Sequence, residues 1–111
     1  MVDDLSLPTG TVTLVLGDVE NSTSGWDEDP ASMLDEIRSL YATVDELAQT
    51  HGGTRPEEQG EGDSFVVAFG RARNAVVFTV ALQRSLRESA NHQLRIGIHT
   101  GDVELRDASN Y

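Results

Sequence analysis

The chain has 111 residues, of which 38% are apolar and 24% charged, a composition typical of one small folded domain. Its 19 acidic and 8 basic residues give a formal net charge of −11, which argues against binding to nucleic acids or anionic membranes. All the basic residues are arginines and cysteine is absent, which excludes lysine chemistry, disulfides and thiolate metal sites. No apolar run approaches the ~18 residues of a membrane span, and the acidic N-terminus does not resemble a secretory signal, so we expect a cytoplasmic domain.

The first half of the chain predicts a strand followed by an amphipathic helix. Residues 11–16 are β-branched or leucine and lie between two glycines, which predicts a buried strand. The acidic run 27–29 is interpreted as a solvated loop, and Asp29-Pro30 at its end is a typical helix start. Apolar residues then recur at helical spacing as far as Gly52-Gly53, which predicts the end of the helix. The polar segment 54–59 contains a proline and suits an edge strand.

The second half predicts a strand, a helix and a further strand. Residues 64–69 are a second buried strand and residues 72–89 a second helix. Residues 94–99 alternate in polarity and predict a third long strand, while Thr100-Gly101 predicts a turn before one more strand containing Val103 and Leu105. The apolar face of the second helix is expected to contain Ala72, Ala75, Val76, Thr79, Leu82 and Leu86, widened by Val77, Val80 and Ala81.

This order of elements predicts an α+β fold, a ferredoxin-like βαββαβ sandwich. In that topology the first and third strands are antiparallel neighbours, so Asp18 at the end of one lies beside Asp63 at the start of the other. Two carboxylates suit a hard cation such as Mg²⁺ or Mn²⁺, and two ions ~3.5–4 Å apart can stabilise both oxygens of a phosphoryl displacement. The alternative is that Asp18 only caps a helix and Asp63 only occupies a turn, although two neighbouring like charges are costly unless something neutralises them.

Two further polar features follow these strands. Ser22 and Thr23 indicate the start of a short helix or turn, whose free backbone N–H groups could hold a phosphate; ordinary capping is the alternative. His99 lies on the outward face of a predicted strand, so we expect a surface or dimer-contact residue rather than a catalytic base.

Three stretches, TVTLVLGDVENST (11–23), QGEGDSF (59–65) and RIGIHTGDV (95–103), resemble the catalytic domain of class III adenylate and guanylate cyclases. The likeness is greatest to mycobacterial-type members, including those fused to LuxR-type regulators, and it runs from Pro8 to Tyr111. The resemblance implies the ferredoxin-like nucleotidyl cyclase core and a homodimer with active sites at its interface. It also implies conversion of a nucleoside triphosphate to a 3′,5′-cyclic nucleotide and pyrophosphate, with ATP favoured over GTP.

The resemblance implies roles for particular residues. Asp18 and Asp63 match the two metal aspartates, and Val19 matches the residue whose backbone carbonyl joins a metal. The triphosphate-binding segment corresponds to Glu20, Asn21, Ser22 and Thr23. Gln59 and Asn110 occupy the positions of the base-reading lysine and aspartate. Because these two amides carry no charge, we expect weak selectivity for the base.

The sequence also departs from the family pattern. Leu16-Gly17 replaces a common Phe-Thr, and Asn21 and Ser64 each replace a common glycine. In the family, the chain continues past the position of Tyr111 into a helix whose asparagine and arginine stabilise the transition state. Residues 1–111 are therefore expected to be a partial cyclase domain that alone is inactive or nearly so. The alternatives are a regulatory, nucleotide-binding or dimerisation module, and a ferredoxin-like fold without a ligand.

Overall fold

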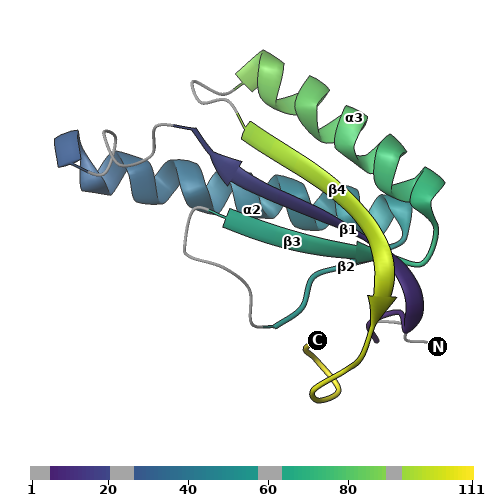
Figure 1. Cartoon of the computed structure of the whole chain (residues 1–111). Coiled ribbons are helices and arrows are strands. Elements are labelled where there is room, and N and C mark those ends of the chain that lie inside the picture. The colour runs from purple at the N-terminus through teal and green to yellow at the C-terminus, as the bar shows by residue number, and fades with distance from the viewer. Residues whose placement is uncertain (1–5, 21–26, 58–63, 90–93) are drawn as a thin grey trace.

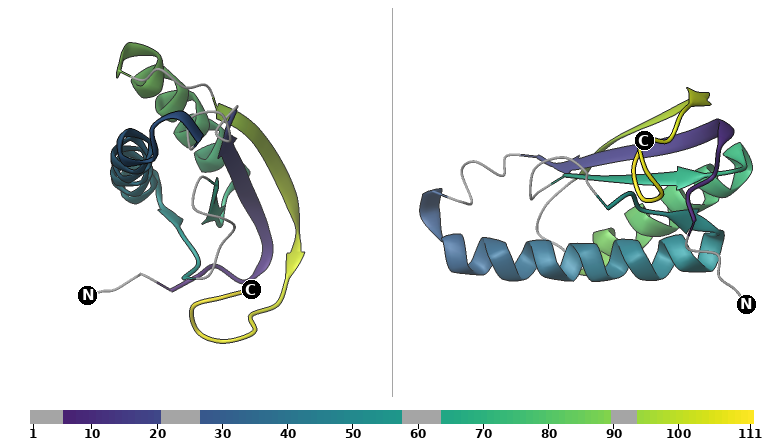
Figure 2. Two further views of the ribbon diagram at one scale, coloured as in Figure 1. Left: turned by 90° about the vertical axis from the view of Figure 1, so that its left-hand side faces the viewer. Right: turned by 90° about the horizontal axis from the view of Figure 1, so that it is seen from below.

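The computed structural model describes residues 6–20, 27–57, 64–89 and 94–111, which form one antiparallel sheet and two helices (Figure 1). The sheet has the strand order β2-β3-β1-β4, and every neighbouring pair is antiparallel. Both helices lie on the same face of the sheet and leave its other face open (Figure 2). This is the predicted ferredoxin-like arrangement. In chain order the elements are β1 (Gly10–Val19), α2 (Pro30–His51), β2 (Gly53–Thr54), β3 (Ser64–Phe69), α3 (Ala72–Ser89) and β4 (Leu94–Val103).

Local sequence signals set both ends of α2, as predicted. The Asp29 side chain accepts a hydrogen bond from the backbone N–H of Ser32 at 3.2 Å, and Pro30 occupies the first turn. Gly52 ends the helix with a φ of 79°, a left-handed conformation that glycine adopts without strain. The buried residues recur at helical spacing and turn one face of α2 toward the sheet: Met33, Ile37, Leu40, Val44 and Ala48.

The core lies between the sheet and the two helices. Phe69 of β3 packs against Phe78 of α3 with ring centroids 5.2 Å apart, and both rings are fully buried. With Ala75 and Leu82, Phe78 forms the face of α3 that contacts the sheet. The prediction that Val76 belongs to this face was wrong, because Val76 lies about a third of a turn from its centre and is 50% exposed.

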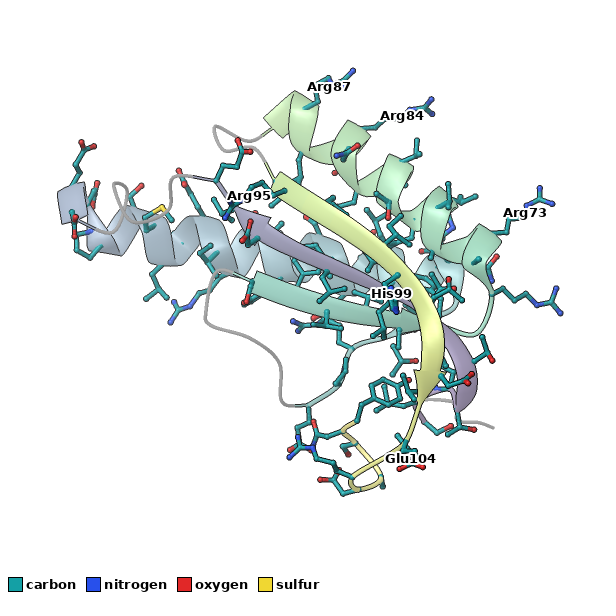
Figure 3. The ribbon with its side chains drawn as sticks, in the orientation of Figure 1. Arg73, Arg84, Arg87, Arg95, His99 and Glu104 are labelled. Carbon is teal, nitrogen blue, oxygen red and sulfur yellow. The ribbon has the colours of Figure 1, made fainter. Side chains whose placement is uncertain are left out.

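The outer side of α3 is exposed and carries positive charge. Figure 3 shows Arg73, Arg84 and Arg87 projecting from this helix away from the sheet. Val77 and Val80 also lie outside the core. Each is 43% exposed, so these side chains, which were predicted to widen the apolar face, contact solvent. In the described part of the chain, neither α2 nor α3 is both long and apolar enough to cross a membrane.

Strand β4 is longer than its sequence predicted, and β2 is shorter. The predicted turn at Thr100-Gly101 was wrong, because β4 runs unbroken to Val103 and pairs with β1 along its whole length. Thr13 and Thr100 also form a hydrogen bond between their hydroxyl oxygens at 2.8 Å, which supports the pairing through this region. Of the predicted edge strand at 54–59, the described residues 54–57 place only Thr54 in β2, which ends before Pro56, a residue without an N–H donor.

The pairing of β1 with β3 places Asp18 opposite Ser64 and Gly17 opposite Phe65. The first and third strands are thus antiparallel neighbours, as predicted, while Asp63 itself lies outside the described residues. A Cβ atom at Gly17 would lie 2.6 Å from Cε2 of the buried Phe65 ring, closer than real contacts allow. The ring therefore packs directly on the backbone of Gly17, one residue before Asp18.

We predict that Gly17→Ala lowers the free energy of unfolding by about 1–3 kcal/mol, because the added methyl displaces the Phe65 ring. Gly97→Ala is the matched control, since a Cβ on this strand glycine meets no atom within 4 Å. Urea denaturation of both variants measures the difference. Equal stability of Gly17→Ala and Gly97→Ala would contradict the packing argument.

Candidate functional site

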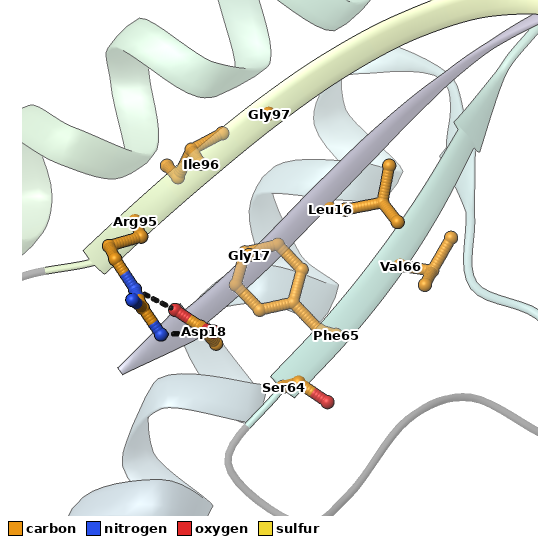
Figure 4. Close-up of a pocket in the computed structure, with 9 residues that line it drawn as sticks. All are labelled: Leu16, Gly17, Asp18, Ser64, Phe65, Val66, Arg95, Ile96 and Gly97. Atoms are coloured by element: carbon orange, nitrogen blue, oxygen red, sulfur yellow. Dashed lines mark hydrogen bonds and ion pairs between the residues drawn. The ribbon is translucent and has the colours of Figure 1, made fainter. Parts of the chain in front are cut away.

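A pocket of about 460 Å³ lies over the end of β1 that carries Asp18 (Figure 4). Side chains alternate along β1, so Leu16 and Asp18 project from the open face while Val15 and Val19 enter the core. Arg95 stands opposite Asp18 in the β1–β4 register and shares its face. The pocket is lined by residues of three strands: Leu16, Gly17, Asp18, Ser64, Phe65, Val66, Arg95, Ile96 and Gly97.

Asp18 and Arg95 form a two-pronged ion pair. Nε of Arg95 donates to Oδ1 of Asp18 at 2.9 Å, and Nη2 donates to Oδ2 at 2.9 Å. The side chains remain accessible, with 39% of Asp18 and 66% of Arg95 exposed. The hydrogen bond and charge of Asp18 raise the pKa of Arg95 above its ordinary value, and the charge of Glu20 adds to this effect. Arg95 is therefore a fixed positive charge across both carboxylate oxygens.

Sequence reasoning did not identify Arg95 as a site residue. The alternating pattern of residues 94–99 placed it on a strand, but its partner lies 77 positions earlier in the chain. Only the pairing of β1 with β4 brings the two together. His99 lies on the same strand and is exposed, as predicted, opposite Leu14 of β1 (Figure 3).

The donor chemistry at this end of the sheet fits a hard divalent cation. Asp18 supplies carboxylate oxygens, the ligand type that such cations take, and the guanidinium of Arg95 contacts both of them. Asp63 precedes Ser64, the residue paired with Asp18. The described residues contain no group of three or more histidines, aspartates or glutamates that could hold a metal. A metal site here therefore depends on Asp18 together with residues beyond the described ranges.

The predicted triphosphate segment is described only at its start. Val19, 5% exposed, ends β1 opposite Leu94, and the half-buried Glu20 follows it directly. The other predicted site residues in the β1–α2 and β2–β3 connections lie outside the described residues: Asn21, Ser22, Thr23, Gln59 and Asp63.

Asn110 lies in a turn at the C-terminal end of the described chain and is only 4% exposed. Its side-chain amide donates to Oδ1 and Oδ2 of Asp107 at 3.1 and 3.3 Å. Asp107 also accepts from the backbone N–H of Ser109 at 2.8 Å, and these hydrogen bonds lower the pKa of Asp107. The hydroxyl of Tyr111 donates to the carbonyl of Pro8 at 2.7 Å and fastens the turn to the segment before β1.

The Asn110 turn follows the end of β4 that pairs with the start of β1, whereas Asp18 lies near the other end of β1. Gly10, at the start of β1, pairs with Val103, and the eight steps from Gly10 to Asp18 span about 26 Å. The backbone N–H of Glu57 donates to the carbonyl of Ser109 at 2.9 Å. The described end of the segment that leads toward Gln59 therefore contacts the Asn110 turn.

Comparison with known sequences finds one matching domain family and several relatives. The model of the adenylate and guanylate cyclase catalytic domain matches residues 6–108. The uncharacterized protein Rv0891c of Mycobacterium tuberculosis H37Rv is 51% identical over 100 residues, which cover 90% of this chain and 34% of that protein. An adenylate cyclase of Lachancea kluyveri is 33% identical over 86 residues, covering 78% of this chain and 5% of that enzyme. The chain thus spans about a third or less of these relatives.

Solved structures show the same fold. An adenylate cyclase of Trypanosoma brucei in its monomeric state superposes with a TM-score of 0.77 and 25% identity, covering 94% of this chain and 63% of that chain. The guanylate cyclase domain of RhGC from Catenaria anguillulae, in complex with GTP, has a TM-score of 0.73 and 19% identity over 83% of this chain and 57% of that one. With the family match over almost its whole length, the chain belongs to the adenylate and guanylate cyclase catalytic domain family.

Proposed function

We propose that this chain is the metal- and nucleotide-binding part of a class III nucleotidyl cyclase domain. The reaction is conversion of ATP, or less favourably GTP, to a 3′,5′-cyclic nucleotide and pyrophosphate. The observation that carries the proposal is the position of Asp18, which ends β1 opposite the start of β3 and lines a pocket formed by three strands. Family membership supports the reaction class.

Several groups would hold the triphosphate and its metal ions. Asp18, Asp63 and the backbone carbonyl of Val19 would hold Mg²⁺ or Mn²⁺, which supplies positive charge to the phosphates and to the attacking hydroxyl. The segment Glu20–Thr23 would offer backbone N–H groups to phosphate oxygens. Arg95 adds a planar guanidinium, whose fork of donors matches phosphate oxygens, at the same end of the sheet.

The separation of the two parts of the site supports a homodimer. Asn110 follows the end of β4 that pairs with Gly10, and Glu57 donates a hydrogen bond to the same turn, whereas Asp18 lies eight residues along β1 from Gly10. Base-reading groups of one protomer would therefore serve the nucleotide held at Asp18 of its partner. The open sheet face is the natural contact surface, because no helix covers it and Leu16 is 44% exposed there.

A second candidate function is a regulatory module that binds metal and nucleotide, or only dimerises, without turnover. The geometry of Asn110 favours it, because the NH₂ group of this amide, which would otherwise donate to the base, already donates to Asp107. Nucleotide binding without formation of cyclic nucleotide would support this candidate over the enzyme.

We predict that Asp18→Asn weakens Mn²⁺ binding in the presence of a non-cleavable ATP analogue by at least about tenfold, because a neutral amide replaces a charged ligand. Isothermal titration calorimetry measures the affinity. Asp102→Asn is the matched control: Asp102 is an exposed aspartate at the other end of the sheet that accepts a hydrogen bond from Thr11 at 2.7 Å. Equal binding by wild type and both variants would remove Asp18 from the site.

We predict that Gln59→Ala weakens binding of the ATP analogue and changes the ratio of ATP to GTP affinity, because an amide can donate to and accept from a base. Competition between the two analogues for the protein measures this ratio. Glu57→Ala is the control, because the contact of Glu57 with Ser109 uses only its backbone N–H. A ratio unchanged in Gln59→Ala, with affinity intact, would exclude Gln59 from base recognition.

We predict that the chain self-associates and that Leu16→Glu weakens this association, because it places a charge on the open sheet face. Sedimentation velocity over a range of concentrations measures the monomer fraction. Leu34→Glu on α2 is the control, since Leu34 is 42% exposed but lies on the helix side. A wild-type chain that stays monomeric at high concentration, or equal effects of the two variants, would contradict this interface.

A further inference from the structure

Arg95 occupies the position that a cation must take at Asp18. Its two donors contact the two carboxylate oxygens at 2.9 Å each, so a positive charge already offsets the charge of Asp18 (Figure 4). A divalent cation that approached Asp18 alone would meet a guanidinium within the same contact shell. Like charges in contact repel each other, so the guanidinium and the divalent cation compete for the carboxylate.

We infer that Arg95 competes with the divalent cation for Asp18 and thereby makes metal binding depend on the nucleotide. This inference rests on the proposed function, in which Asp18 is a metal ligand. It assigns Arg95 a positioning role that precedes any chemistry: the arginine keeps Asp18 engaged until a triphosphate enters the pocket.

The exposure of the pair allows it to open. The side chains of Asp18 and Arg95 are 39% and 66% exposed, and ion pairs this accessible are weak because water screens them. A triphosphate carries several negative charges and offers the guanidinium a stronger partner than one carboxylate. Once Arg95 turns toward the phosphates, Asp18 becomes free to hold the metal.

The surroundings of Arg95 leave it room to move. Its nearest neighbour on the same face of β4 is Gly97. A Cβ atom added to Gly97 would meet no atom within 4 Å. The pocket therefore has open space next to the guanidinium, along the line of β4. Glu20 is the other carboxylate whose charge acts on Arg95, and it lies at the start of the predicted phosphate segment. Arg95 can thus shift within the pocket without disturbing the core.

The metal and the nucleotide must then raise each other's binding affinity by the same factor. If nucleotide releases Asp18 for the metal, linkage requires that metal also tightens nucleotide binding equally. In a site without this competition, Mn²⁺ alone would bind Asp18 readily. The measurable signature of Arg95 is therefore the ratio between Mn²⁺ affinity with and without nucleotide.

The test measures the affinity of the 111-residue chain for Mn²⁺. The electron paramagnetic resonance signal reports the concentration of free Mn²⁺. We expect Arg95→Gln to bind Mn²⁺ alone roughly tenfold more tightly than wild type, within the usual range of coupling between sites. With a non-cleavable ATP analogue present, its affinity for Mn²⁺ should rise less than that of wild type. Arg95→Lys, which keeps the charge but loses the two-pronged geometry, should fall between the two.

Arg73→Gln is the matched control, because it removes the same charge from the exposed outer side of α3 (Figure 3). It should leave both Mn²⁺ affinities unchanged, whereas a general effect of net charge would raise them. Equal binding of Mn²⁺ alone by wild type and Arg95→Gln would overturn the competition, and the proposed function would survive if both still bind Mn²⁺ with nucleotide. Failure of wild type and variant to bind Mn²⁺ even with nucleotide would overturn both.

Discussion

The contact between the Phe65 ring and the backbone of Gly17 is the constraint on which the site depends. The ring is buried on the helix side of the sheet and leaves no room for a side chain at position 17. Side chains alternate along a strand, so a shift of one residue between β1 and β3 would move either Asp18 into the core or Phe65 into solvent. The cost of either change fixes the register. The same packing that stabilises the core therefore places Asp18 opposite Ser64 on the open face.

One face of the sheet stabilises the fold, and the other carries the polar residues of the candidate site. Both helices pack on one face, where Phe69 of β3 meets Phe78 of α3. The other face keeps Asp18, Arg95 and Leu16 within reach of ligands or a second protomer. A chain with a formal net charge of −11 repels a triphosphate, so binding requires cations at the pocket. Arg95 is one such cation, and a divalent metal at Asp18 would be another.

Local signals predicted more of the fold than of the site. Asp29 and Gly52 mark the ends of α2 because capping depends on a few adjacent residues. The buried face of α3 was misassigned because Phe78 contacts a distant strand, and helical spacing alone does not show which of several apolar stripes is covered. The contact of Arg95 with Asp18 could not be predicted from the sequence either, because it forms only when β4 pairs with β1 in this register. That Asp18 lies beside the start of β3 was predictable, because the predicted topology makes β1 and β3 antiparallel neighbours.

The most direct test of this account maps a paramagnetic ion on the folded chain. Mn²⁺ added at a low ratio with a non-cleavable ATP analogue broadens the nuclear magnetic resonance signals of amides close to the bound metal. The account predicts that the amide signals of Asp18, Glu20 and Ser64 are lost first, while those at the C-terminal end of α2 stay sharp. Broadening centred on the acidic residues 27–29, with the Asp18 signal unchanged, would contradict it.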